Sequence, residues 1–267
     1  MLADSISINI DLPSGRLDRD IHLPCTAKLE LVGFIAKELP RWRDHPDRPS
    51  ADAETTLTEH LCDHLNSAVY YSPIWSHVQF RTETGDETRG GRKIDLTVKP
   101  RAAAFIIEGR RHSQFDPLFP IECKRLPIPK GPDRDKREYV TTEYGTTGGI
   151  QRFKFGLHGA AHTFAAMIAY VQEQSFSYWL DQVNSWIRDL AAGPDSVWSD
   201  SDTLQSLSDN LTTKISKLQS EHRRVGGLDV CELRHLWIRM SRYLQIIGHK
   251  NQRVSPHLNV VIYTTFR

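Results

Sequence analysis

The chain of 267 residues has few cysteines, and the four it has, Cys25, Cys62, Cys123 and Cys231, lie far apart. No two of them have the close spacing of a zinc knuckle, and such scattered cysteines are not typical of a disulfide framework. We expect four reduced, buried thiols. Small zinc modules and disulfide-rich secreted scaffolds are therefore excluded.

Long apolar runs are also missing. The longest strongly apolar segment, residues 165–171, is far too short to cross a bilayer. The first four residues, MLAD, do not begin a secretory signal. The sequence thus predicts a soluble, cytoplasmic protein with no membrane partner, and its length suits one α/β domain over residues 1–267.

Neither sign of charge is in excess overall, since the formal net charge is +1. Residues 81–154 nevertheless hold 16 Lys and Arg against 11 Asp and Glu, an excess of +5, so the rest of the chain carries −4. The basic side chains in this part are Arg89, Arg92, Lys93, Arg110, Arg111, Arg125, Lys130, Arg134, Lys136, Arg137, Arg152 and Lys154, among others. Such an excess favours a polyanionic partner, although surface strands and loops also carry mixed charges.

Two short apolar segments each contain a carboxylate. Residues 94–98 (IDLTV) contain Asp95, and residues 119–126 (FPIECKRL) contain Glu122 and Lys124. Residues two apart on a strand point to one face, so pairing of the two strands would bring all three side chains together. Two hard carboxylates beside an ammonium can hold Mg²⁺ or Mn²⁺, with the carbonyl of Cys123 as a further ligand. Lys124 would orient the attacking water or help to deprotonate it.

A helix is predicted over residues 51–68, with Asp52 or a neighbour as N-cap and a leucine every four residues from position 57 to 65. Glu54 falls near this apolar face, whereas Glu59 lies about 200° around the helix from it. If a helical carboxylate joins the site, Glu54 is favoured over Glu59. The alternative is that Glu54 only complements the positive end of the helix dipole.

Periodicity predicts the remaining elements. Helices are expected at residues 26–39, ended by Pro40, and at 175–190, where Trp179 and Trp186 are read as core. Strands are expected at 5–12, 78–83, 102–107, 164–171, 233–240 and 258–266. Residues 204–218 suggest a helix, although the part after Lys214 could equally be a strand. Loops are predicted at residues 108–118 and 127–138, and the second loop is expected to be mobile and close to the site. Separately, the two glycines at 148 and 149 could form the N-terminus of a helix that lies close to a phosphate.

At these residues the sequence resembles the PD-(D/E)xK nuclease superfamily. Asp95 is similar to the metal-binding Asp of that family, and Glu122 with Lys124 matches its Glu-x-Lys half motif. Glu54 is similar to its helical carboxylate, and Gln151 to a glutamine found near the site in many members. Residues 165–190 also resemble uncharacterised bacterial members.

The resemblance covers residues 51–190 and departs from the family at two points, because no Pro precedes Asp95 and a long basic insert separates it from Glu122. It implies a restriction-endonuclease-like central mixed β-sheet flanked by α-helices, elaborated at both ends of the chain. It also implies a link to restriction and antiviral defence.

The combined reading predicts a metal-dependent nuclease that hydrolyses DNA phosphodiester bonds. The expected nucleic-acid contacts are Arg92, Lys93, Arg125, Lys130, Arg152 and Lys154. The alternatives are an RNA nuclease of the same fold, a catalytically inactive nucleic-acid-binding subunit, or an interaction module. No helix-turn-helix or zinc module stands out, which suggests control by an ATPase or helicase subunit or by homodimerisation.

Overall fold

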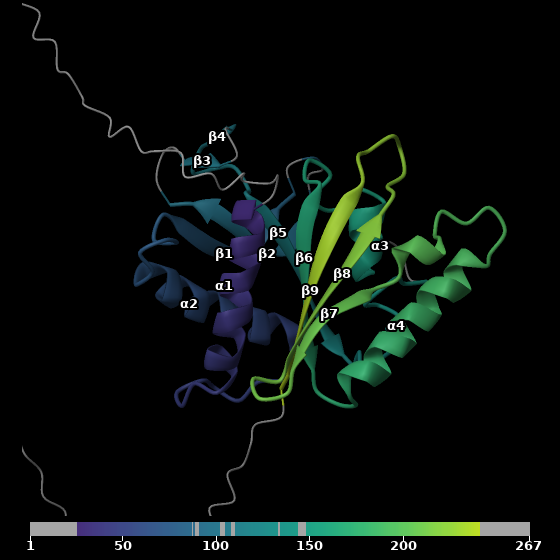
Figure 1. Cartoon of the computed structure of the whole chain (residues 1–267), viewed down its shortest axis with the longest axis horizontal. Helices are drawn as coiled ribbons and strands as arrows, with labels where there is room; N and C mark the ends of the chain where they lie inside the picture. Colours follow the sequence, from purple (N-terminus) through teal and green to yellow (C-terminus); the bar gives the residue numbers. More distant parts are fainter. Residues whose placement is uncertain are drawn as a thin grey trace, which may run out of the picture.

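The computed structural model describes residues 26–86, 88, 91–101, 105–107, 110–132, 134–143 and 148–240 (Figure 1). The strands predicted at 5–12 and 258–266 lie outside these residues. Within the described part, no helix combines the length and the apolar character that crossing a membrane requires.

A seven-stranded mixed sheet forms the centre of the molecule. Its strands, in spatial order, are β1 (Val78–Gly85), β2 (Lys93–Pro100), β5 (Phe119–Leu126), β6 (Phe164–Val171), β9 (Cys231–Arg239), β8 (Ile215–His222) and β7 (Gln205–Asn210). β5, β6 and β9 are parallel, and the other neighbours are antiparallel. Two short strands, β3 (Phe105–Ile107) and β4 (Arg110–His112), form a separate hairpin.

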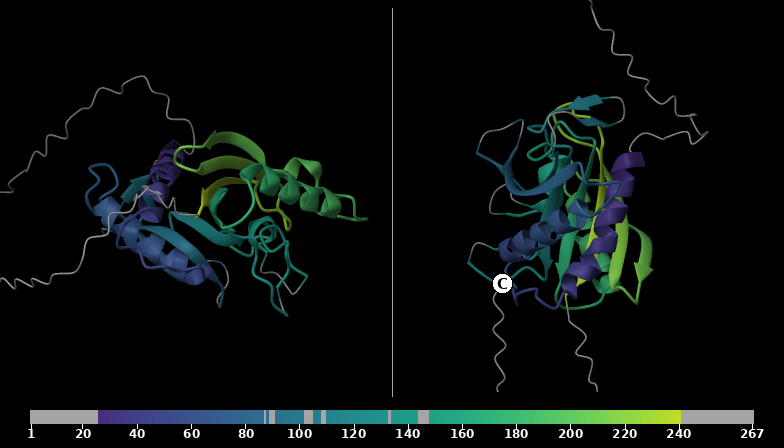
Figure 2. Two further views of the ribbon diagram at one scale, coloured as in Figure 1. Left: turned by 90° about the horizontal axis from the view of Figure 1, so that it is seen from below. Right: turned by 90° about the vertical axis from the view of Figure 1, so that its left-hand side faces the viewer.

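Helices cover both faces of this sheet (Figure 2). They are α1 (Thr26–Arg43), α2 (Glu54–Tyr70), α3 (Gly149–Lys154) and α4 (Phe176–Ala191), with a 3₁₀ turn, η1, at Asp200–Asp202. Even-numbered residues of β6 join a core formed with α1 and α2, and odd-numbered ones join a core formed with α3 and α4. β6 is therefore buried on both faces, as an uninterrupted apolar strand should be. The predicted mixed α/β class is confirmed.

The element pattern follows the sequence in most places. β2 and β5, the strands that carry Asp95 and Glu122, are antiparallel neighbours, as the predicted cluster required. The strand at 164–171 forms as predicted. Trp179 and Trp186 are buried in the core under α4, whose first turn is capped by Ser175. Segments outside residues 51–190 are integral to the fold, because α1 and β9 contribute to the same two cores.

Pro40 does not end the first helix. The helix continues to Arg43 because the last turn is fixed by tertiary contacts. Trp42 is 1 % exposed in the core, and the Arg43 guanidinium donates to the carbonyl oxygens of Thr213 and Arg239 at 3.0 and 3.3 Å. At the start of α2, the N-cap is Ala53, the neighbour of Asp52, and it makes no side-chain capping bond.

The helix predicted at 204–218 is wrong, and the strand alternative for the part after Lys214 is right. β7 and β8 form an antiparallel hairpin there. Leu207 and Leu211 are 51 % and 87 % exposed, so their helical spacing did not reflect a buried face. In the predicted loop at 108–118, the short strand β4 pairs with β3.

The glycines before α3 serve packing. The first three amide N–H groups of α3, from Gly149 to Gln151, donate to the carbonyls of residues 138–140 at 2.8–3.1 Å. A Cβ at Gly148 or Gly149 would collide with the backbone of Thr141 or Tyr139. This helix end is therefore occupied by protein, which corrects the predicted phosphate site. The predicted loop at 127–138 has no helix or strand among its described residues, and its last residue, Glu138, is 7 % exposed.

Candidate functional site

β2 and β5 separate at Asp95. Their register joins Val98 to Phe119 and Leu96 to Ile121 and then stops. On the other side, the pairing of β1 with β2 also skips Asp95. The residue opposite it, Glu83, has a left-handed φ of 48°, which is unusual and costly for a residue other than glycine. Asp95 therefore sits where the sheet opens locally.

Two carboxylates lie in this opening and accept the backbone N–H groups of β5 that no longer pair with β2. Asp95 Oδ2 accepts the N–H of Cys123 at 2.9 Å, and Glu54 Oε2 accepts the N–H of Arg125 at 3.0 Å. The N–H and C=O of one strand residue point to the same side, so the carbonyl of Cys123 also points into the opening. The thiol of Cys123 is buried in the core on the sheet's other face.

Lys124 joins three carboxylates drawn from three elements. Its Nζ lies 3.0 Å from Glu54 Oε1, 3.1 Å from Glu122 Oε1 and 3.7 Å from Asp95 Oδ2, and its side chain is only 4 % exposed. Burial alone would lower the pKa of Lys124, but the charges of Glu122, Asp95 and Glu54 outweigh it and raise the pKa. The predicted cluster of Asp95, Glu122, Lys124 and Glu54 is thus brought together.

Glu122 is fully buried and has two further partners that come from α3 and the turn after it. Arg152 Nη1 pairs with Glu122 Oε1, and His158 Nδ1 lies 3.2 Å from Oε2. The following residue, Gly159, donates its N–H to Asp86 Oδ2 at 2.8 Å, which fixes this turn. Sequence reasoning missed His158 and Asp86, since no local pattern links either to a strand some 30 residues or more away.

The two acids of the pair differ in proton affinity. Burial, followed by repulsion from Glu122, raises the pKa of Asp95 to about 7. Burial would also raise the pKa of Glu122, but the charges of Lys124 and Arg152 and the hydrogen bond from His158 outweigh it and hold that pKa at about 2. The cluster thus keeps Glu122 ionised and leaves Asp95 short of positive charge.

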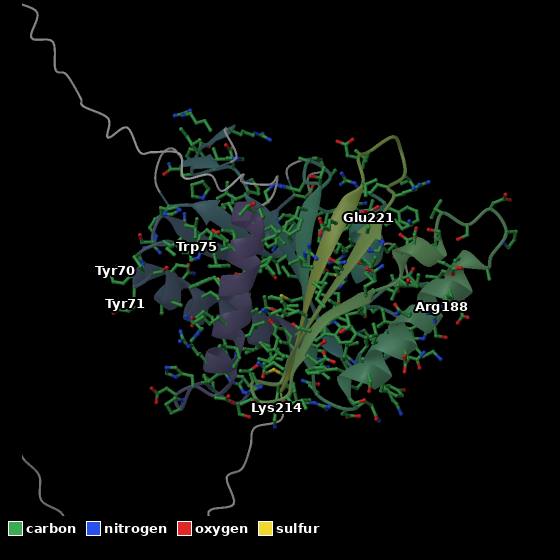
Figure 3. All side chains as sticks on the ribbon, viewed as in Figure 1. Tyr70, Tyr71, Trp75, Arg188, Lys214 and Glu221 are labelled. Carbon is green, nitrogen blue, oxygen red and sulfur yellow. The ribbon has the colours of Figure 1, made fainter. Side chains whose placement is uncertain are left out.

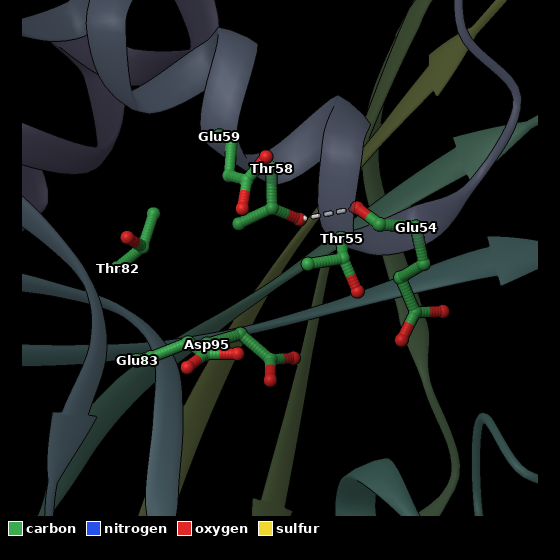
Figure 4. Close-up of a pocket in the computed structure, with 7 residues that line it drawn as sticks. All are labelled: Glu54, Thr55, Thr58, Glu59, Thr82, Glu83 and Asp95. Carbon is green, nitrogen blue, oxygen red and sulfur yellow. Dashed lines mark hydrogen bonds between the residues drawn. The ribbon is translucent and has the colours of Figure 1, made fainter.

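A small acidic pocket opens beside Asp95, between the first turns of α2 and the strands β1 and β2 (Figure 4). It is lined by Glu54, Thr55, Thr58, Glu59, Thr82, Glu83 and Asp95. The Thr58 hydroxyl donates to the carbonyl of Glu54 at 2.8 Å and so fixes the turn that carries this carboxylate. Glu59 lines the same pocket but is exposed, so the structure places Glu54, and not Glu59, against Lys124.

The site's oxygen atoms suit a hard divalent ion. Asp95, Glu122 and Glu54 supply carboxylates, and the Cys123 carbonyl points into the same opening. The described residues hold no cluster of three or more Asp, Glu, His or Cys side chains arranged as a ligand set. Mg²⁺ that is bound by one or two carboxylates and several waters does not need such a protein cage.

Other predicted site residues lie elsewhere. Gln151 accepts the N–H of Thr142 at 3.4 Å through its side-chain oxygen, so its side chain bonds the preceding loop. Lys154 is 0 % exposed and bonded to Asp202, which removes it as a nucleic-acid contact. The ammonium of Lys154 forms a buried ion pair and contributes nothing to a basic surface.

The basic residues that the sequence predicts as nucleic-acid contacts are only partly brought together at the site. Arg92 Nη1 donates to the Leu157 carbonyl at 3.4 Å, Lys93 pairs with Glu83 at 2.6 Å, and Lys130 is exposed. Arg125 donates to the carbonyl of Asp52 beside Glu54. Arg110 and Arg111 lie on β4 of the separate β3–β4 hairpin, outside the central sheet that carries Asp95 (Figure 1).

A second polar chain crosses the core under α3 and η1. Lys154 Nζ lies 2.8 Å from Asp202 Oδ1, which lies 2.7 Å from His222 Nδ1. The Ser220 hydroxyl lies 2.7 Å from both His222 Nε2 and His235 Nε2, and the other nitrogen of His235 lies 2.8 Å from the hydroxyl of Tyr139.

This chain has the bonding order of a hydrolase triad, but it serves the fold. Ser220 is 4 % exposed, and its hydroxyl is shared between two buried imidazoles. Every group is satisfied if Nδ1 of His222 and Nε2 of His235 carry the protons and both rings are neutral. Burial, which lowers the pKa of both histidines, favours this state.

In the absence of metal, Asp95→Asn is expected to stabilise the protein at pH 8 by about 1–2 kcal/mol. The folded-state pKa of about 7 exceeds the ordinary 3.8, so the folded protein holds an extra proton between about pH 4 and 7 and loses stability as the pH rises through that range. Asparagine can still accept the N–H of Cys123. Urea unfolding in EDTA between pH 5 and 8 checks this, with the exposed Glu59→Gln as control, and equal pH dependence in wild type and Asp95→Asn would contradict it.

Comparison of the chain with protein-family models, with curated proteins and with solved structures found no match. The resemblance to the PD-(D/E)xK superfamily therefore rests on the residues of the site and their arrangement.

Proposed function

We propose that the chain is a Mg²⁺-dependent endodeoxyribonuclease of the restriction-endonuclease-like fold. The observation that carries the proposal is the convergence of Glu54, Asp95 and Glu122 on the ammonium of Lys124, at the point where β2 and β5 separate. The central mixed sheet with helices on both faces supports the same family.

The charge of the cluster suits a phosphodiester. Three carboxylates face two permanent cations, Lys124 and Arg152, which leaves one net negative charge. Glu138 is neutralised separately by Arg134 at 3.3 Å. A divalent ion would make the cluster net positive by one, which matches the single negative charge of a phosphodiester.

The roles follow from the positions. Asp95 and Glu122, with Glu54 and the Cys123 carbonyl in reach, would hold the ion, which when bound supplies Lewis acidity and an activated water. Lys124 would offset charge that develops on the phosphoryl oxygens and orient the water, since its ammonium lies 3.1 Å from Glu122 Oε1 and 3.7 Å from Asp95 Oδ2. His158 holds Glu122 in place through Oε2.

The expected result is cleavage of labelled DNA that requires Mg²⁺ or Mn²⁺ and disappears in EDTA. Glu122→Gln keeps the shape of the side chain but removes the charge, so it should lose cleavage while thermal unfolding still shows a folded protein. Labelled RNA digested alongside separates the two substrates. Cleavage by Glu122→Gln at the wild-type rate would sink the proposal, and salt-dependent DNA binding without cleavage under any metal would indicate the inactive binding subunit.

A role in bacterial antiviral defence and control by an ATPase or helicase subunit, or by homodimerisation, remain predictions from the resemblance and from the lack of a recognisable target-reading module. Copurification of the active protein alone, in monomeric form and without regulation, would count against such a partner.

A further inference from the structure

The two oxygens of Glu122 are held by different groups. Oε2 is approached by His158, at 3.2 Å. Oε1 is shared by Lys124, at 3.1 Å, and by Arg152. A cation that reaches Glu122 through Oε1 must therefore displace one of these two donors.

The two donors are not held equally. Lys124 stands on β5, is 4 % exposed and has two more carboxylate partners, Glu54 and Asp95. Arg152 stands on the six-residue helix α3, its side chain is 16 % exposed, and among the described residues its ion-pair partner is Glu122. Displacing Arg152 breaks one ion pair at the margin of the site, whereas displacing Lys124 would break the contacts of its buried ammonium with three carboxylates at once. Arg152 is therefore the donor that a cation displaces from Glu122 Oε1.

We propose that Arg152 is an exchangeable counter-ion: a divalent cation takes its place on Glu122, and the released guanidinium binds a phosphate of the nucleic acid. The inference rests on the proposed nuclease function. A guanidinium matches a phosphate with two parallel hydrogen bonds, so its release supplies a contact absent from the metal-free protein. Metal and nucleic acid then bind cooperatively, each strengthening the other by the same factor.

The test measures binding of a labelled DNA duplex by fluorescence anisotropy at fixed ionic strength, in EDTA and in Ca²⁺, for wild type and Arg152→Met. Wild type should gain affinity about tenfold or more in Ca²⁺. Arg152→Met should bind like wild type in EDTA, because Arg152 is then engaged with Glu122, and should lose most of the Ca²⁺-dependent gain. Arg188→Met on the exposed face of α4 (Figure 3) is the matched control and should behave like wild type in both conditions.

Calorimetry without DNA provides a second readout. Arg152→Met should bind Ca²⁺ several-fold more tightly than wild type, since the competing cation is gone, and Arg152→Lys should fall between them. If Arg152→Met unfolds, Arg152→Lys carries both tests. Equal loss of DNA affinity with and without Ca²⁺ would make Arg152 a permanent contact and overturn the exchange. Unchanged DNA affinity in both conditions, or weaker Ca²⁺ binding, would overturn it as well.

Failure of the nuclease proposal is distinguishable from failure of the exchange. Coupling of Ca²⁺ and DNA through Arg152 without cleavage in Mg²⁺ would overturn only the catalytic assignment. Cleavage by wild type with no effect of Arg152→Met on the Ca²⁺-dependent gain would overturn only the exchange.

Discussion

Lys124→Met should abolish metal-dependent cleavage and, in EDTA at pH 8, lower the free energy of unfolding by about 3–5 kcal/mol. The ammonium is the shared counter-ion of Glu54, Glu122 and Asp95, at 3.0, 3.1 and 3.7 Å. Methionine fills a similar volume but leaves three carboxylates close together with Glu122 fully buried. The loss of cleavage follows because no other lysine stands at the opening between β2 and β5 in the part of the chain that the structure describes.

The same variant separates a metal site from a plain ion-pair cluster. Mg²⁺ should raise the stability of Lys124→Met more than that of wild type, because a divalent ion restores the missing positive charge. Lys93→Met is the matched control: Lys93 also pairs with a glutamate, Glu83 at 2.6 Å, but both side chains are more than half exposed. Its removal should change the stability by less than about 1 kcal/mol. A Lys124→Met protein as stable as wild type in EDTA would contradict the shared role of the ammonium.

The elements that carry the acids could be predicted because their signals are local. β5 and β6 are apolar runs bounded by turn residues, and the leucine stripe of α2 repeats every four residues. Pairing of β2 with β5 then required only that these two strands lie side by side while the segment between them, which carries the β3–β4 hairpin, stays outside the central sheet. Glu54, Asp95, Glu122 and Lys124 could be assembled from these elements for that reason.

What the sequence could not show depends on distant partners. His158 reaches Glu122 only through the turn after α3, and Asp86 fixes that turn from the end of β1. A count of basic residues could not distinguish Lys154, which is fully buried, from Arg152, which lies at the margin of the site. At the far edge of the sheet, Leu207 and Leu211 have helical spacing but are exposed, so periodicity alone predicts a helix where β7 forms.

The buried pair of Lys154 and Asp202 supports the second large prediction. Lys154→Met should lower the free energy of unfolding by about 3–5 kcal/mol, because it leaves the Asp202 carboxylate, 1 % exposed, without its cation. Asp202→Asn should cost a similar amount by stranding the ammonium 3.0 Å from the Arg223 carbonyl. Urea unfolding of each variant, followed by tryptophan fluorescence, measures these losses.

The double variant of Lys154→Met with Asp202→Asn decides what the pair does. Removing both charges eliminates the stranded ion, so the double variant should be more stable than the sum of the single losses predicts, by about 2 kcal/mol or more. The side-chain amide introduced by Asp202→Asn would still present a carbonyl oxygen to His222, and the chain through Ser220 to His235 could remain bonded. DNA affinity of folded Lys154→Met should equal that of wild type, because the ammonium does not reach the surface. Additive losses would contradict the coupling of the two charges. A selective loss of DNA binding would return Lys154 to the nucleic-acid contacts that the sequence predicted.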